Sequence, residues 1–299
     1  MCLWDIETII EAELSNWGVP EVLRGENPKH SANYYQRRDD YTLPMLQVDA
    51  IPARFDDAAV AYDKLGKYHE AIALMEDKEA RFPGLYETYS NWGTFLTHAG
   101  RLAEGLALLK KALTINPDAH FGREHYQISL IEFAIQCKAD PGLIERRDFL
   151  GLDLARAVKD LEEPAGLSLQ KVGIKEDVFS ALTALMRFGA ADKHAGTWFS
   201  LGLAIAYGQP EGQLFAMQAL RRAEVLGHPR AQFFIEVLRR GVLRLPALER
   251  PWYRRATEPY EELMENFDAD FAEGQAEVLL AQTEEDQKLR DGDTSLFGY

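Results

Sequence analysis

Residues 55–117 read FDDAAVAYDKLGKYHEAIALMEDKEARFPGLYETYSNWGTFLTHAGRLAEGLALLKKALTINP. This stretch contains one pattern twice, with a constant spacing of 34 residues between equivalent positions. The equivalent pairs are Gly66 and Gly100, Tyr68 and Leu102, Glu70 and Glu104, Ala71 and Gly105, Met75 and Leu109, and Pro83 and Pro117. A period of this length is typical of repeats that each form one helical hairpin. We therefore predict an all-α fold organised around these two copies.

The two copies predict four helices, over residues 58–65, 68–81, 86–99 and 102–115. Gly66 and Gly100 follow the first helix of each copy, where a residue without Cβ suits the left-handed conformation that ends a helix. Small residues, such as Gly93 and Gly105 in the second copy, stand where the two helices of a hairpin must approach closely. A larger side chain at such a crossing forces the helices apart, so we expect close backbone contact there.

The order of residue types in these copies resembles the tetratricopeptide repeat family. The second copy carries the residues of the family pattern at Trp92, Gly93, Leu96, Gly105, Leu109, Ala112 and Pro117. The first copy carries them at Tyr62, Gly66, Tyr68, Ala71, Met75 and Pro83, and departs from the pattern at Ala58, Ala59 and Lys78. The resemblance implies a right-handed α-solenoid of helical hairpins, in which the first helix of each repeat lines a concave groove.

That implied groove defines the candidate partner-binding residues. They are Asp56, Val60, Asp63, Lys64, Glu87, Ser90, Asn91, Thr94, Thr97, His98, Phe121, Glu124, Ile128 and Glu132. Acids outnumber bases in this set, which favours a basic or neutral extended peptide or protein as the partner. The alternative is that the acids only keep an uncovered groove hydrated. A clamp for acidic chaperone tails needs lysines and asparagines, and only Asn91 matches it, so we do not expect that ligand.

Outside the two copies the chain is less regular. We divide it into an N-terminal helical segment (1–50), the repeats (51–138), an irregular helical insert (139–195), a further repeat (196–240) and a basic linker with an acidic capping helix (241–299). The expected helices are 5–14, 120–137, one carrying Phe149, Leu150, Leu152, Leu154 and Val158, then 176–188 and 259–289. The aromatic pair Tyr34 and Tyr35 is expected to pack on the first repeat.

The segment 196–240 carries a second resemblance. Trp198, Leu201 and Gly202 have the spacing of a first repeat helix, and Ala216, Leu220 and Ala223 have that of a second one. The run 219–232 resembles the Sel1-like repeat, in which the second helix ends at a glycine and the next helix starts a few residues later. Residues 258–293 hold thirteen acids against two bases. A polar helix of this kind suits the end of a solenoid, where it would act as a cap.

Composition excludes several classes of function. A net charge of −15 disfavours nucleic acid and anionic membranes as partners. No apolar run is long enough to predict a membrane span. Cys2 and Cys137 are the only cysteines, so no disulfide framework is expected. We expect a cytoplasmic protein, or an exported one if Met1 replaces a removed signal; Cys2 is then either a lipidation site or a buried thiol.

The leading hypothesis is a non-catalytic scaffold for protein binding, with no cofactor and no metal. None of the common nucleotide-binding, hydrolase or metalloprotease motifs is present in the sequence. Two alternatives stay open. One is a structural component that assembles through its ends and its C-terminal helix. The other is an enzyme with an unrecognised site near His98, Glu124 and His125.

Overall fold

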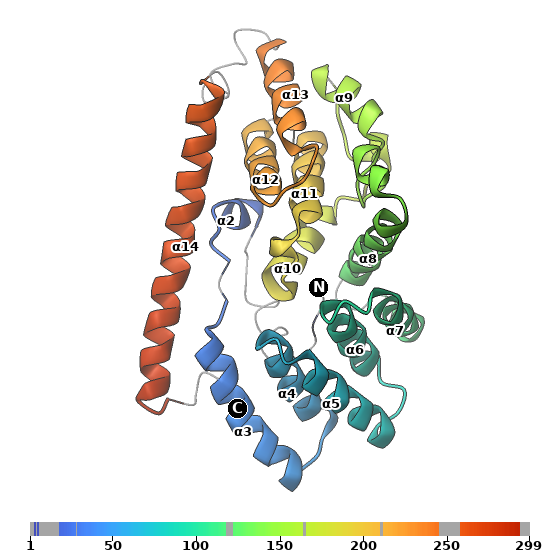
Figure 1. Ribbon diagram of the computed structural model, residues 1–299, viewed down its shortest axis with the longest axis vertical. Helices are drawn as coiled ribbons and strands as arrows, with labels where there is room; N and C mark the ends of the chain where they lie inside the picture. Colours follow the sequence, from blue (N-terminus) through green and yellow to red (C-terminus); the bar gives the residue numbers. More distant parts are fainter. Residues whose placement is uncertain are drawn as a thin grey trace. The chain divides into compact units, whose positions relative to one another are not determined.

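The computed structural model describes residues 3, 5, 18–27, 29–117, 122–163, 166–209, 212–244 and 258–293. Within these ranges the chain forms α-helices α2 to α14 and three short 3-10 helices, with no β-strand among them (Figure 1). The predicted all-α class is therefore confirmed. None of the described helices combines the length and the apolarity that crossing a lipid bilayer requires.

The chain divides into two compact units, and each is assembled from stretches that are far apart in the sequence. Unit 1 comprises residues 1–16, 28–131 and 276–299, and unit 2 comprises residues 17–27 and 132–275. The five segments predicted from the sequence are consecutive stretches, whereas both units draw on each end of the chain. The two units are described separately below.

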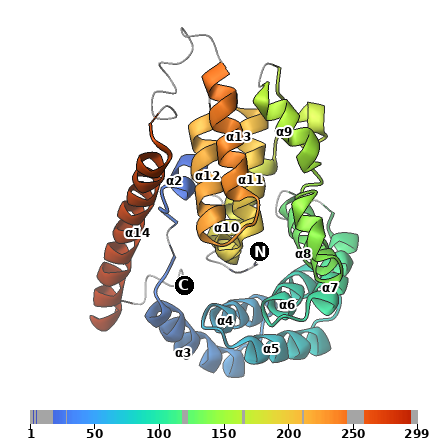
Figure 2. The same cartoon turned by 45° about the horizontal axis from the view of Figure 1, so that its top comes forward.

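Unit 1 is built on the repeated stretch. Its helices are α3 (Ala32–Val48), α4 (Pro52–Lys64), α5 (Tyr68–Arg81), α6 (Tyr86–His98) and α7 (Leu102–Ile115), followed by the start of α8 (Arg123–Ala139). Each helix from α3 to α7 packs against the next, and α4 also contacts α6 (Figure 2). The bounds of α5 and α7 agree with the prediction, and α6 ends one residue before the predicted end.

The start of α4 differs from the prediction. The helix begins at Pro52, six residues before the predicted start at Ala58. Proline fits the first turn of a helix because it has no N–H to leave unbonded and its φ is already helical. The first turn of α4 precedes the residues that match between the two copies, so the repeat pattern alone does not predict where the helix starts.

Glycines end the first helix of both copies, as predicted. Gly66 and Gly100 have φ of 75° and 80°. In the first copy the N–H of Lys67 donates to the carbonyl of Tyr62 at 2.9 Å, and in the second copy Arg101 repeats this bond. These bonds satisfy carbonyls that the helix leaves open at its C-terminal end.

The expected close approach of the hairpin helices is confirmed at the second copy. A Cβ placed on Gly105 would lie 2.6 Å from the carbonyl oxygen of Gly93 and 2.4 Å from Oγ1 of Thr97. A Cβ on Gly93 would lie 2.9 Å from the carbonyl oxygen of Gly105. Helices α6 and α7 therefore meet backbone to backbone, which only the absence of side chains allows.

The C-terminal half of α14 (Tyr260–Arg290) packs on the N-terminal end of α3 within unit 1. Leu289 joins Tyr34, Tyr35 and Ala61 in one buried apolar cluster, which confirms that the tyrosine pair docks on the first repeat. Ser31 caps α3, and its hydroxyl also donates to Asp286 at 2.5 Å. A carboxylate is favourable at this position because the N-terminus of a helix carries a partial positive charge. The acidic helix thus packs against the N-terminal end of α3, next to the first repeat.

Unit 2 contains α2 (Val19–Leu23), α9 (Leu154–Glu162), α10 (Val178–Gly189), α11 (Ala195–Gly208), α12 (Gln213–Val225) and α13 (Ala231–Arg244), with parts of α8 and α14. Helices α11 and α12 form a hairpin, and a Cβ on Gly202 would lie 2.8 Å from Leu220 Cγ. Helix α12 ends just before Gly227, and α13 starts at Ala231. The predicted glycine break between two closely spaced helices is confirmed.

The helix predicted to carry Phe149 to Val158 is wrong in its first part. Helix α9 starts only at Leu154, after a turn in which Gly151 has φ of 88°. The N–H of Leu152 donates to Oδ1 of Asp148 at 2.8 Å, and the N–H of Arg156 donates to Asp153. Asp153 therefore caps the helix and Asp148 holds the preceding turn, an effect of local hydrogen bonding that apolar spacing does not capture.

The remaining predicted helices agree closely with the structure. Helix α8 covers 123–139 where 120–137 was predicted, α10 covers 178–189 where 176–188 was predicted, and α14 covers 260–290 where 259–289 was predicted. The helix predicted over 5–14 lies outside the described residues, apart from Asp5, and so does Cys2.

Candidate functional site

The first helices of the repeats, α4 and α6, are joined by buried polar side chains. Asn91 Nδ2 on α6 donates to Asp56 Oδ1 on α4 at 2.9 Å. The other oxygen of Asp56 accepts from Lys78 Nζ of α5 at 2.6 Å, and the Lys78 side chain is fully buried. Burial raises the pKa of Asp56 to about 7, against the lowering effect of Lys78 and Asn91. Asp56 thus forms an interhelix bond rather than an exposed groove charge.

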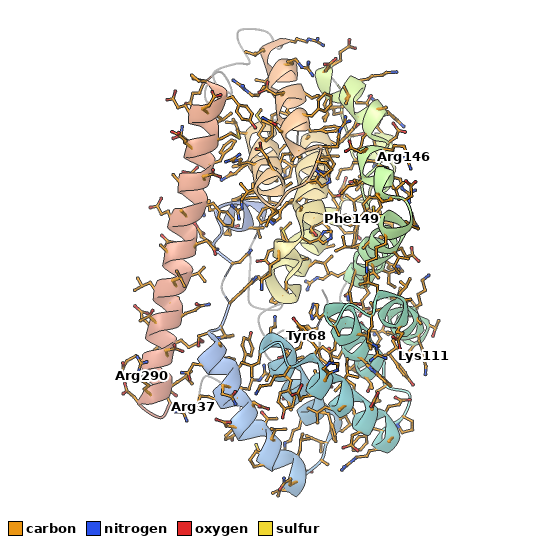
Figure 3. The ribbon with its side chains drawn as sticks, viewed as in Figure 1. Arg37, Tyr68, Lys111, Arg146, Phe149 and Arg290 are labelled. Carbon is orange, nitrogen blue, oxygen red and sulfur yellow. The ribbon has the colours of Figure 1, made fainter. Side chains whose placement is uncertain are left out.

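At the C-terminal end of the same two helices, a second bond repeats the spacing. His98 Nδ1 lies 2.6 Å from Asp63 Oδ1, and the separation of 35 residues equals that of Asp56 and Asn91. The ring of Tyr68, labelled in Figure 3, lies 5.9 Å from the imidazole of His98. Nε2 of His98 is buried without a hydrogen-bond partner among the described residues. The imidazole therefore bridges α4 and α6 through one nitrogen.

Helices α6 and α8 are joined in the same way. The hydroxyls of Ser90 and Tyr86 both donate to Oε1 of Glu124, the first at 2.6 Å. Gln127 Nε2 donates to Thr94 Oγ1 at 2.9 Å. These pairs are separated by 33 to 38 residues, close to the repeat period. We call these four contacts the polar ladder: Asp56–Asn91, Asp63–His98, Ser90–Glu124 and Thr94–Gln127.

The predicted groove residues fall into three groups. Those buried between the helices are Asp56, Val60, Asp63, Ser90, Asn91, Thr94, Thr97, Glu124 and Ile128. Those half-buried, and so still reachable from the solvent, are Lys64, Glu87, His98 and Glu132. Phe121 lies outside the described residues. The surface that the first helices offer a partner is therefore carried by the second group, on a base fixed by the polar ladder.

The three residues of the enzyme alternative are not brought together around one centre. His98 is the last residue of α6, whereas Glu124 bonds to Tyr86 and Ser90 in the first half of that helix. Eight residues of helix separate Ser90 from His98, which is about 12 Å along the axis. His125, the next residue after Glu124, is exposed. This spread does not form a compact acid–base pair.

Metal and thiol chemistry find little support in the described ranges. No group of three His, Cys, Asp or Glu side chains there has the arrangement that a metal ion needs. Cys137 is half-buried, and burial raises the pKa of its thiol, which disfavours the reactive thiolate.

Sequence reasoning missed the buried cations of unit 1. Lys78 was noted only as a departure from the small residue of the family pattern, yet it neutralises Asp56. Arg38 of α3 was given no role, and it is fully buried between two carboxylates, Asp5 and Asp57. A charged residue at a position where the repeat pattern expects a small one was the available signal for Lys78. No local signal marked Arg38.

Unit 2 has its own buried polar groups. Asp148 accepts from the hydroxyl of Ser200 at 2.7 Å, and burial raises the pKa of its carboxyl to about 6. His228 stacks on Phe199, with ring centroids 3.8 Å apart. Burial, together with the neighbouring His194 and Arg230, lowers the pKa of His228 to about 4. The imidazole is therefore neutral near pH 7 and acts as part of the core.

A scan against protein-family models and a search of curated proteins both find no match to this chain.

Proposed function

We propose that the protein is a non-catalytic scaffold that binds an extended peptide or a segment of a partner protein across α4, α6 and α8. The observation that carries this proposal is the polar ladder. Four directional contacts at the repeat spacing fix the first helices against one another. A surface that is fixed before binding loses less conformational entropy when a ligand docks, which favours a recognition function.

The resemblance to tetratricopeptide repeats supports the same function. The paired hairpins α4–α5 and α6–α7, with the glycine crossing of α6–α7 and the contact between α4 and α6, agree with what that resemblance implies. The half-buried acids Glu87 and Glu132 favour a partner segment that is neutral or basic over most of its length.

Charge reversal of these two acids tests the proposal. Displayed random 12-residue peptides are selected on the wild-type chain, and the affinity of the best peptide is measured by fluorescence anisotropy. Glu87→Lys with Glu132→Lys is expected to weaken binding at least about tenfold, because two attractive charges become repulsive. Asp63 is left unchanged because it holds His98 and is itself buried.

The matched control is Glu70→Lys with Glu76→Lys. Both residues are exposed on the second helix α5, and the change in net charge is the same. The control should bind the selected peptide as the wild-type chain does. Failure to enrich any peptide, or equal binding by the Glu87/Glu132 variant, would contradict the proposed function.

The assembly alternative receives no such support. The C-terminal half of α14, through which assembly was envisaged, contacts residues of the same unit: Gln282 bonds to Lys29, Glu285 and Asp286 bond to the cap residue Ser31 of α3, and Leu289 packs on α3. Those side chains are thus used inside the chain.

A further inference from the structure

The N-terminal residues Leu3 and Asp5 are buried in unit 1 although they precede every repeat helix. Leu3 is 1% exposed and belongs to the apolar cluster that contains Phe55 and Val60 of α4. Asp5 is 2% exposed. The two side chains are two residues apart in the sequence, and both are buried in unit 1.

Arg38 of α3 provides the polar half of this contact. Its Nη1 donates to Asp5 Oδ2 at 2.6 Å, and its Nη2 donates to Asp57 Oδ1 of α4 at 3.0 Å. All three side chains are at least nine-tenths buried. The planar guanidinium presents several N–H groups in a fixed fork, so Asp57 can orient it while another amino group holds a second carboxylate.

This contact lies on the helix face that was predicted to bind a partner. Asp57, Val60 and Lys64 are three and four residues apart on α4, so they share one face of the helix. Val60 and Lys64 belong to the predicted groove, and Val60 is clustered with Leu3. The face at the α3–α4 end is therefore covered by the chain's own N-terminal segment.

We infer that the side chains of Leu3 and Asp5 are an internal ligand of the binding face, and that the external partner carries the same signature: an apolar side chain followed two residues later by a carboxylate. This inference rests on the proposed function and adds a chemical requirement at one end of the partner. The incoming carboxylate replaces Asp5 on Arg38, and the incoming apolar side chain replaces Leu3 beside Val60. The Asp57 carboxylate stays on Arg38 and keeps it neutralised during the exchange.

The exchange has a simple consequence for affinity. A tethered segment acts at an effective concentration on the order of millimolar, so a free peptide competes poorly with it. The double variant Leu3→Ala with Asp5→Asn in the full chain, here called the weakened chain, should hold its own N-terminal residues less tightly. The site on Arg38 and Val60 is then expected to be open to a free peptide. The probe is a fluorescein-labelled peptide of residues 1–10 in which Cys2 is replaced by serine. It should bind the weakened chain at least about tenfold more tightly than the wild-type chain.

Two controls make the test specific. The same peptide with Leu3→Ala and Asp5→Asn should bind neither chain. Arg38→Lys in the weakened chain keeps the charge but removes the fork, and should reduce binding of the probe at least about tenfold. A weakened chain that keeps its helical circular dichroism but binds the probe no better than the wild-type chain would overturn the inference.

A measurement on the wild-type chain covers the case in which the weakened chain does not fold. Hydrogen exchange of residues 1–10 is followed by mass spectrometry beside that of α4. A detachable segment exchanges at least about a hundredfold faster than α4 because it opens locally. Equal rates would show that the segment leaves only on global unfolding, and the inference would be wrong. The Glu87/Glu132 test is independent, so it separates a failure of this inference from a failure of the scaffold function.

Discussion

Hairpins α6–α7 and α11–α12 solve the same packing problem but bury different chemistry. In both, a glycine of the first helix faces a leucine of the second, Gly93 against Leu109 and Gly202 against Leu220. Helix α6 nevertheless buries polar side chains along much of its length, among them Ser90, Asn91 and Thr94, whereas α11 buries mainly apolar ones, with Thr197 and Ser200 as its buried polar residues. The glycine crossing within a hairpin therefore does not determine which side chains the hairpin buries against the neighbouring helices.

The two hairpins therefore depend on different interactions: directional hydrogen bonds around α6 and non-directional apolar packing around α11. Apolar burial in α11 depends on area and packing, so it tolerates changes of the same volume. The polar ladder of unit 1 works only when every donor meets its acceptor, because a buried group without a partner is costly. Unit 1 is therefore the better candidate for a surface of defined geometry, and unit 2 for a supporting core.

The largest effect is expected from removing Lys78, the buried cation that pairs with Asp56 of the polar ladder. Lys78→Met leaves Asp56 buried without its ion-pair partner, which typically costs about 3–5 kcal/mol of stability. The cost should be greater at pH 8 than at pH 5, because the raised pKa of Asp56 lets the carboxyl take up a proton in the folded state. Urea unfolding, with the circular dichroism followed at both pH values, measures this.

The direction of this pH dependence follows from the raised pKa of Asp56. A carboxyl whose pKa is raised on folding stabilises the fold below its unfolded pKa of about 4, and this contribution is lost as pH rises through about 7. The double variant Lys78→Met with Asp56→Asn should recover most of the lost stability, because the amide keeps an acceptor for Asn91. A Lys78→Met loss that does not change with pH would contradict the role given to Asp56.

The contribution of His228 to the stability of unit 2 is expected to depend on pH in the opposite direction to that of Asp56. The folded pKa of His228, about 4, is below the unfolded value of about 6.5, so its contribution is present above pH 6.5 and is lost as pH falls towards 4. The shift corresponds to about 3 kcal/mol at full effect. Asp148, whose pKa is raised to about 6, contributes in the opposite direction over the same pH range. Hydrogen exchange in α11 to α13 should therefore carry an acceleration between pH 6.5 and 4 that depends on His228, after correction for the intrinsic rate.

His228→Asn provides the control for this prediction. Asparagine keeps a side-chain acceptor for the N–H of Arg230 but does not titrate. The variant should lose the additional acceleration in α11 to α13, while α4 to α7 behave as in the wild-type chain. Acceleration that is equal in both chains would show that another group is responsible.

The smallest effect distinguishes the two crossings themselves. Gly105→Ala places a Cβ 2.6 Å from a backbone carbonyl oxygen, which cannot move aside alone, and should cost about 2–3 kcal/mol. Gly202→Ala places a Cβ 2.8 Å from the side-chain atom Cγ of Leu220 and 3.0 Å from a carbonyl oxygen, so the contact with the backbone is less severe and the cost should be about 1 kcal/mol. If urea unfolding shows that both variants lose the same free energy of unfolding, the two crossings are equally tight.

The sequence was most informative where local periodicity and local geometry coincide. The bounds of α5 and α7 followed from repeat spacing and from the glycines and prolines around them. Helix α9 was misplaced because Asp148 and Asp153 form turn and cap bonds that a pattern of apolar residues does not express. The candidate groove residues were chosen as first-helix positions, and the sequence did not show that several of them, such as Asp56 and Asn91 or Asp63 and His98, bond to one another.

By itself, the sequence determined the all-α class, the hairpin period and the small residues at the helix crossings, because these depend on residues close together along the chain. Only the tertiary structure decided the partners of the buried charges: Asp5 and Asp57 on Arg38, Lys78 on Asp56, and Asp286 on Ser31. Periodicity specifies which face of a helix turns inward. Which distant side chain meets that face depends on how the helices pack, and that is settled only when the whole unit folds.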